Sequence, residues 1–67
     1  MKEYHVILRD GDGQPLTDWH AWGAAEMRDC IKTAREDWGH YPVLQFIVKD
    51  ESGTVAIDRT YRSKVTV

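Results

Sequence analysis

Residues 2–13 read KEYHVILRDGDG, and this stretch decides the fold because it joins an alternating segment to a turn of defined chemistry. Its apolar and polar residues alternate, with Tyr4, Val6 and Leu8 on one side and Glu3, His5, Ile7 and Arg9 on the other. A period of two is that of a β-strand. The Asp-Gly pairs at 10–13 supply the positive φ angles of tight hairpin turns. The sequence therefore predicts a strand that enters a hairpin.

The residues after this turn predict a short return strand and then a helix. Residues 14–17 predict the return strand, with Pro15 at the sheet edge because proline has no N–H to donate. Between Trp19 and Trp38, apolar residues recur at steps of three and four, which places them on one stripe of a helix: Ala24, Met27, Ile31, Ala34 and Trp38. Thr17 or Asp18 is the expected N-cap, and Gly39 is expected to end the helix in a left-handed conformation. The helical pattern starts at Trp19, but Gly23 weakens the first turns and favours a start near Trp22, so the sequence leaves the start of the helix open.

The last third of the chain predicts a second hairpin. Tyr41-Pro42 ends helical geometry. Residues 43–49 alternate, residues 50–53 form a turn cluster, and residues 54–61 alternate again. Residues 64–67 could pair at an edge or fray. We therefore expect one α+β domain over residues 1–67, in ββαββ order, with an antiparallel or mixed sheet and one amphipathic helix packed on one face.

Two stretches carry a resemblance to known proteins. Residues 4–13 and 49–55 are similar to the two hairpins of small uncharacterised bacterial hairpin-helix-hairpin proteins that open with an Arg-Asp-Gly-Asp-Gly turn. The resemblance implies the fold and brings no activity or site residues with it. In size the chain also resembles small phage-encoded inhibitors such as anti-CRISPR proteins.

Length and composition limit the classes of function. A 67-residue chain with one cysteine is a single unit without internal disulfides, which fits a reducing, cytoplasmic compartment. We expect no signal peptide and no membrane partner, because the apolar runs are far shorter than the roughly 20 residues that span a bilayer. The formal net charge of −2 makes nucleic acid an unlikely class of partner, since phosphate contacts call for a basic excess.

No motif in the sequence predicts catalysis, a cofactor or a metal. Counted as a calcium loop from Asp10, the sixth position is Pro15 and the twelfth is Ala21, so residues 10–13 predict a plain hairpin turn. His5, His20, His40 and Cys30 lack the short paired spacing of zinc sites, and their assignment to different elements predicts no convergence. Cys30 lies beside the apolar stripe and is expected to be a small buried hydrophobe. We therefore expect a non-enzymatic protein.

The remaining functional prediction is a binding surface. One helix covers one face of a sheet, so an opposite, partly apolar face is left for self-association or a protein partner. The residues expected on that face are His5, Ile7, Val43, Gln45 and Ile47. Trp19 is a further candidate, since tryptophan serves both cores and binding sites, and the sequence leaves the choice open. The leading hypothesis is a bacterial or phage-encoded inhibitor or adaptor that occupies a surface of a larger protein.

The alternative hypothesis places a different partner on the C-terminal hairpin. Basic residues gather there around an aromatic one, in the pattern of a weak single-stranded nucleic-acid binder: Lys49, Arg59, Tyr61, Arg62 and Lys64. Asp50, Glu51 and Asp58 lie in the same hairpin, and a mixed, solvated edge is the other interpretation of these charges.

Overall fold

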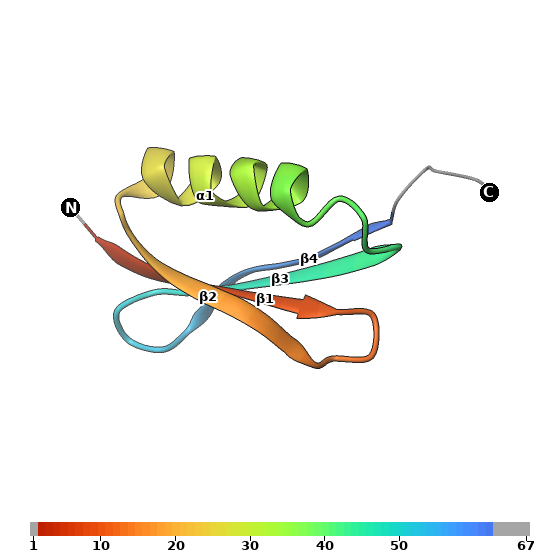
Figure 1. Cartoon of the computed structure of the whole chain (residues 1–67). Helices are drawn as coiled ribbons and strands as arrows, with labels where there is room; N and C mark the ends of the chain where they lie inside the picture. Colours follow the sequence, from red (N-terminus) through yellow and green to blue (C-terminus); the bar gives the residue numbers. More distant parts are fainter. Residues whose placement is uncertain (1, 63–67) are drawn as a thin grey trace.

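Alternating segments form four strands and the apolar stripe forms one helix in a computed structural model, which describes residues 2–62. The elements are β1 (Glu3–Asp10), β2 (Pro15–Trp22), α1 (Ala24–Asp37), β3 (Val43–Lys49) and β4 (Val55–Arg62). Figure 1 shows α1 lying across one face of the sheet. The predicted α+β class and the ββαββ order are confirmed.

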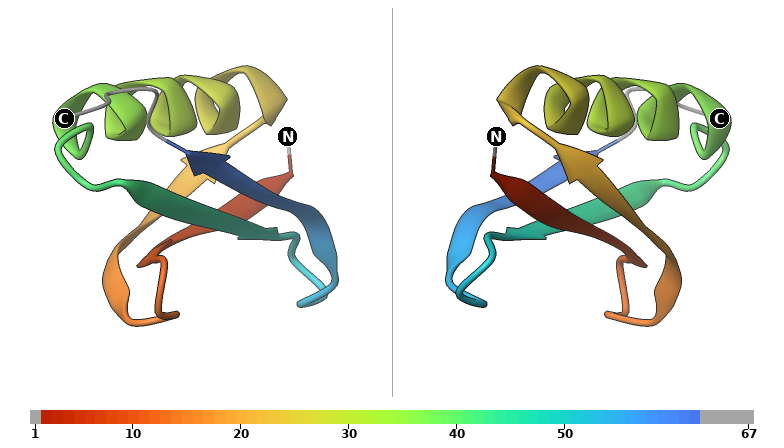
Figure 2. Two further views of the ribbon diagram at one scale, coloured as in Figure 1. Left: turned by 90° about the vertical axis from the view of Figure 1, so that its right-hand side faces the viewer. Right: turned by 90° about the vertical axis from the view of Figure 1, so that its left-hand side faces the viewer.

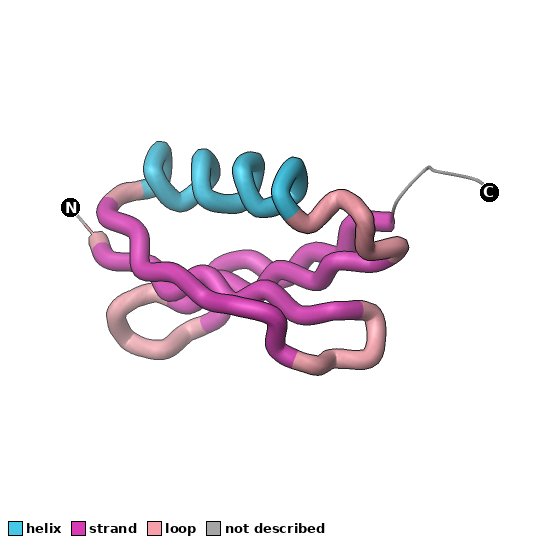
Figure 3. The backbone as a smooth tube through the Cα atoms, viewed as in Figure 1, coloured by secondary structure: helices cyan, strands magenta, loops and turns pink. Residues whose placement is uncertain are grey.

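The four strands form one antiparallel sheet in the order β2-β1-β3-β4. The first strand of each hairpin is central, and β1 joins the two hairpins by pairing with β3, with Ile7 opposite Ile47. The two hairpin turns lie at opposite ends of the sheet (Figure 3). Figure 2 shows that the sheet is strongly twisted, as expected for right-twisted strands. Among the described residues, β2 and β4 are therefore the edge strands of the sheet.

Both hairpin turns use the same chemistry. The Asp10 Oδ1 accepts the backbone N–H groups of Asp12 and Gln14, each at 2.9 Å. The Asp50 Oδ1 accepts the N–H groups two and four residues later, at 2.9 and 3.1 Å. Gly13 and Gly53 close the turns with φ of 83° and 84°, which favours glycine. The carboxylate of Asp10 thus holds its own turn, as the prediction of a plain hairpin requires.

The core lies between α1 and the face of the sheet that α1 covers. Phe46, Leu8, Val6 and Val48 are the largest fully buried side chains, and Met27 and Ile31 of α1 close the core from above. Half-buried aromatic residues, including Tyr4 and Trp38, pack around it. The predicted assignment of strand faces is confirmed. The buried residues of β1 and β3 alternate with the residues predicted for the opposite face, and they are Val6, Leu8, Leu44, Phe46 and Val48.

The boundary between β2 and α1 corrects the sequence prediction. β2 extends to Trp22 instead of ending at Thr17, and α1 begins at Ala24, close to the later of the two starts that the sequence left open. Pairing with β1 satisfies backbone groups along the whole of β2, and Gly23, at φ 85°, makes the turn into the helix while its N–H donates to the Lys2 carbonyl at 2.7 Å. Thr17 and Asp18 are strand residues, so the predicted capping role is wrong.

The end of the helix is also different from the prediction. The C-cap is Trp38, with φ of −106°, and its N–H donates to the Ala34 carbonyl at 2.8 Å. Gly39 has no positive φ, so the predicted left-handed ending is wrong. Residues 64–67, for which the sequence left edge pairing or fraying open, lie outside the described residues.

Candidate functional site

The helix-free face is the face of the sheet opposite α1, which no described residue of 2–62 covers with a second layer. The five residues predicted for it, His5, Ile7, Val43, Gln45 and Ile47, do lie there together and are half-buried. They are half-buried because neighbouring strands flank β1 and β3 on both sides. Their side chains form an apolar centre at Ile7 and Ile47 with polar neighbours around it. The sequence therefore located the middle of this face correctly.

Trp19 does not belong to the helix-free face. It pairs with Val6, whose side chain is fully buried under α1, so it points to the helix side, where it is half-buried and packs against the core. The expectation that Trp19 lies near the helix start is wrong for the same reason, since β2 continues past it.

Trp22 takes the place that sequence reasoning considered for Trp19. Two side chains stand out as large exposed hydrophobics, Trp22 at 55% and Val55 at 50% exposure. Trp22 pairs with Glu3, so it belongs to the helix-free face, four residues along β1 from Ile7. Val55 pairs with Lys49 beside a register shift between β3 and β4. The sequence did contain a period of two that predicts this exposure, because Asp18, His20 and Trp22 alternate with Trp19 and Ala21. The three-residue spacing of the two tryptophans favoured a helix and hid it.

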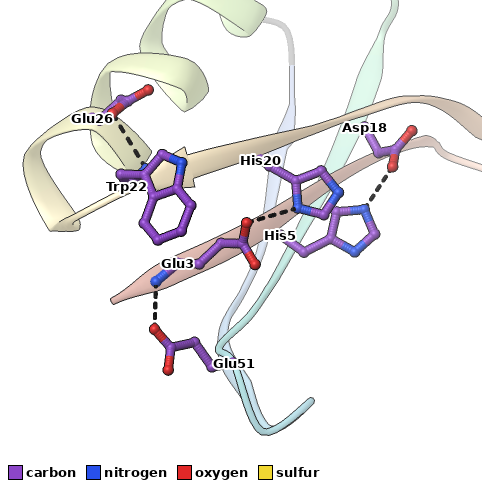
Figure 4. Close-up of polar contacts among 7 residues, drawn as sticks. All are labelled: Glu3, His5, Asp18, His20, Trp22, Glu26 and Glu51. Atoms are coloured by element: carbon purple, nitrogen blue, oxygen red, sulfur yellow. Dashed lines mark hydrogen bonds and ion pairs between the residues drawn. The ribbon is translucent and has the colours of Figure 1, made fainter. Parts of the chain in front are cut away.

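A cluster of histidine and carboxylate side chains lies on the β1 and β2 side of the same face (Figure 4). The rings of His5 and His20, which pair across the strands, are stacked with centroids 4.6 Å apart and planes 2° from parallel. The Nε2 of His5 lies 2.6 Å from the Oδ2 of Asp18. The Nδ1 of His20 lies 3.8 Å from a carboxylate oxygen of Glu3. One potential ligand atom from each of His5, Asp18 and His20 lies within 4.8 Å of the others.

This cluster corrects one step of the sequence reasoning. The histidines were expected not to converge because His20 was placed at the helix start. In the structure, His20 lies in β2 directly opposite His5, and the Asp18 side chain is on the same face two residues earlier. His40, in contrast, lies after α1 beside Tyr41, with ring centroids 4.7 Å apart. Only knowledge of the β1 and β2 register could have brought His5 and His20 together.

A second feature is a groove between α1 and β4, on the helix side of the sheet. Its volume is about 390 Å³, and it exists because α1 packs mainly on β1 and β2. Basic side chains border it from both elements: Arg28, Lys32, Arg35 and Arg59. The guanidinium carbon of Arg35 lies 4.0 Å from the centre of the Tyr61 ring, and the rings of Tyr61 and Phe46 are nearly perpendicular to each other.

The groove separates the basic residues that the alternative hypothesis grouped together. Arg59 and Tyr61 pair with Phe46 and Leu44, both buried, and therefore lie on the helix side. Lys49 and Arg62 lie on the helix-free face, and Lys64 is outside the described residues. The predicted group is thus divided between two faces, and Arg28, Lys32 and Arg35 of α1 line the groove with Tyr61 instead.

Cys30 is half-buried and packs against the core, in agreement with its predicted position beside the apolar stripe. Burial raises the pKa of the Cys30 thiol, and the carboxylates of Glu26 and Asp29 raise it further. A raised pKa disfavours the thiolate, which is the nucleophilic form of cysteine. This environment is the opposite of the electropositive one that activates a cysteine.

No family model, curated protein or solved structure matches this chain significantly. Within residues 2–62, no helix has both the length and the apolar character needed to cross a membrane.

Proposed function

We propose that this chain is a non-enzymatic protein-interaction module that binds a protein partner, or a second copy of itself, through the helix-free face. The observation that carries the proposal is the apolar centre at Ile7 and Ile47, which lies on the two central strands and which no second layer among residues 2–62 covers.

The composition of the face supports binding. Protein interfaces combine an apolar centre with a polar rim, and tryptophan is among the residues that contribute most to binding energy. The helix-free face combines Ile7 and Ile47 at its centre with exposed Trp22 beside the polar Glu3. A module of this kind acts by occupying a surface of its partner, as an inhibitor or adaptor encoded by a bacterium or phage. The single cysteine favours action in the cytoplasm.

The test is to replace Ile7 and Ile47 together by lysine. The two charges lie in the apolar centre, so binding should be lost while the buried core on the other side of the sheet stays intact. Self-association is measured by sedimentation velocity at matched concentrations. Capture of a partner is measured by pull-down from bacterial lysate after nuclease treatment. Circular dichroism verifies that the variant folds.

A matched control adds the same charge elsewhere. Ala25→Lys with Thr33→Lys changes two exposed positions of α1 and should leave both measurements unchanged. If the Ile7 and Ile47 variant binds as the native chain does, or if the helix control loses binding equally, the helix-free face is not the binding surface.

The basic groove supports a second candidate function, weak binding of single-stranded nucleic acid. Arg28, Lys32, Arg35 and Arg59 could contact phosphates, although Arg35 occupies one side of the Tyr61 ring that a base would need for stacking. Fluorescence anisotropy with a labelled oligonucleotide tests it. Binding that weakens with salt and is lost in Arg28→Ala with Arg59→Ala would favour this function over protein binding.

A further inference from the structure

The histidine and carboxylate cluster has the ligand types of a transition-metal site. Imidazole nitrogen and carboxylate oxygen are the usual ligands of zinc and its neighbours, and three protein ligands with an open position form a common coordination set. His5 supplies one imidazole from β1, and His20 and Asp18 supply an imidazole and a carboxylate from β2. We propose that these three residues bind one divalent transition-metal ion, for which Zn²⁺ is the probe, with water in the open position.

The distances between the ligand atoms are close to those that zinc requires. Zinc holds nitrogen and oxygen ligands at about 2.0–2.2 Å in a tetrahedron, so two ligand atoms lie about 3.3–3.6 Å apart. Here the contact between His5 and Asp18 is 2.6 Å, and all three ligand atoms lie within 4.8 Å of one another. The site is completed by small shifts of the ligand atoms together with a rotation of one imidazole, because the in-plane lone pairs of two parallel rings do not converge on one ion. Asp18 and His20 are more than half exposed, so their side chains can make this adjustment without moving the core.

The strands hold the ligands at fixed spacing. His5 and His20 are directly opposite in the register, and Asp18 is two residues from His20 on the same face of β2. Because the ladder hydrogen bonds of the hairpin fix this register, little conformational freedom is lost when a metal binds. The stacked rings already place both imidazoles side by side.

The residues around the cluster favour a cation. The carboxylate of Glu3 lies 3.8 Å from the Nδ1 of His20, which is beyond hydrogen-bond distance. A small movement of these two side chains would let it accept that N–H and leave the other ring nitrogen for the metal, as carboxylates next to metal-bound histidines do. Figure 4 shows the second ring nitrogen of His20 on the side of His5 and Asp18. The backbone N–H of Glu3 donates to the Oε1 of Glu51 at 2.9 Å, so a further carboxylate lies beside Glu3. Lys49 of β3 lies opposite His5, and among residues 2–62 it is the one positively charged residue whose strand pairing is with a proposed ligand.

The experiment titrates the full chain, first stripped of metal by a chelator, with ZnCl₂ in an isothermal calorimeter at neutral pH. We expect saturable binding of one ion per chain. His5→Ala, His20→Ala and Asp18→Asn should each weaken it at least about tenfold, because even residues behind the ligands contribute about 10- to 100-fold to metal affinity. Affinity should also fall as the solution is made acidic, because protons compete with the metal for its ligand atoms.

The matched control is His40→Ala, which removes the third histidine from its place after α1 and should leave zinc affinity unchanged. Circular dichroism confirms folding of each variant, and the exposed position of His20 makes His20→Gln a second, conservative test. Absence of binding, or binding that survives the loss of His5 and His20, would overturn the proposal and leave the cluster as a stacked pair with an ion pair. The proposal does not depend on partner binding by the helix-free face.

Discussion

Phe46 and Ile47 are neighbours in β3 whose side chains lie on opposite faces of the sheet, so a pair of alanine substitutions tests the assignment of faces. Phe46 is fully buried, and its ring centroid lies 5.6 Å from that of Tyr61 in a T-shaped arrangement. Phe46→Ala should cost about 3–5 kcal/mol, from lost burial and the cavity left behind. A chain of 67 residues has a total stability of about 3–10 kcal/mol, so this change removes much or all of it.

Ile47→Ala should behave differently because Ile47 is half-buried on the helix-free face. Its removal creates no closed cavity, and losing part of its burial should cost about 1 kcal/mol. For a domain of this size, that corresponds to a fall in Tm of about 4–8 °C, against more than about 12 °C for Phe46→Ala.

Urea unfolding followed by tryptophan fluorescence measures both free energies, with Phe46→Leu as a control that retains most of the buried volume. Equal losses for the two alanine variants, or a larger loss for Ile47→Ala, would refute the assignment of faces. The helix-free face, on which the binding proposal rests, would then be placed on the wrong side.

Two further predictions concern the turn between β3 and β4. The hydrogen bond from the Ser52 side chain lowers the pKa of the Asp50 carboxyl. The ionised carboxylate therefore stabilises the fold at pH values above the ordinary aspartate pKa of about 3.9. This stabilisation is lost as the pH falls through the lower pKa of the folded state. The difference in unfolding free energy between the native chain and Asp50→Asn should therefore be present at neutral pH and shrink below about pH 4, whereas a constant difference would exclude the charge as its cause. Gly53→Ala should lower the free energy of unfolding by about 1–2 kcal/mol, because Gly53 has a φ of 84°. A Cβ at this position meets no atom within 4 Å, so the loss comes from the backbone conformation alone. An unchanged midpoint of urea unfolding would contradict that account.

The sequence alone determined the strand faces, the two hairpin turns and the core stripe of the helix. Each depends on local information: the two-residue period of β1 and β3, the Asp and Gly residues of the turns, and the three- and four-residue spacing of Met27, Ile31 and Ala34. From these follows the uncovered apolar centre at Ile7 and Ile47.

Tertiary structure decided where β2 ends and what its residues do. Residues 19–22 fit both a helical and an alternating pattern, and pairing with β1 along the whole of β2 selected the strand, which moved Trp19 into the core region and left Trp22 exposed. The same pairing placed His20 opposite His5, 15 positions away in the sequence. The position of α1 over β1 and β2 likewise opened the basic groove beside β4. Such contacts depend on which strands pair and in which register, and no local sequence pattern specifies that.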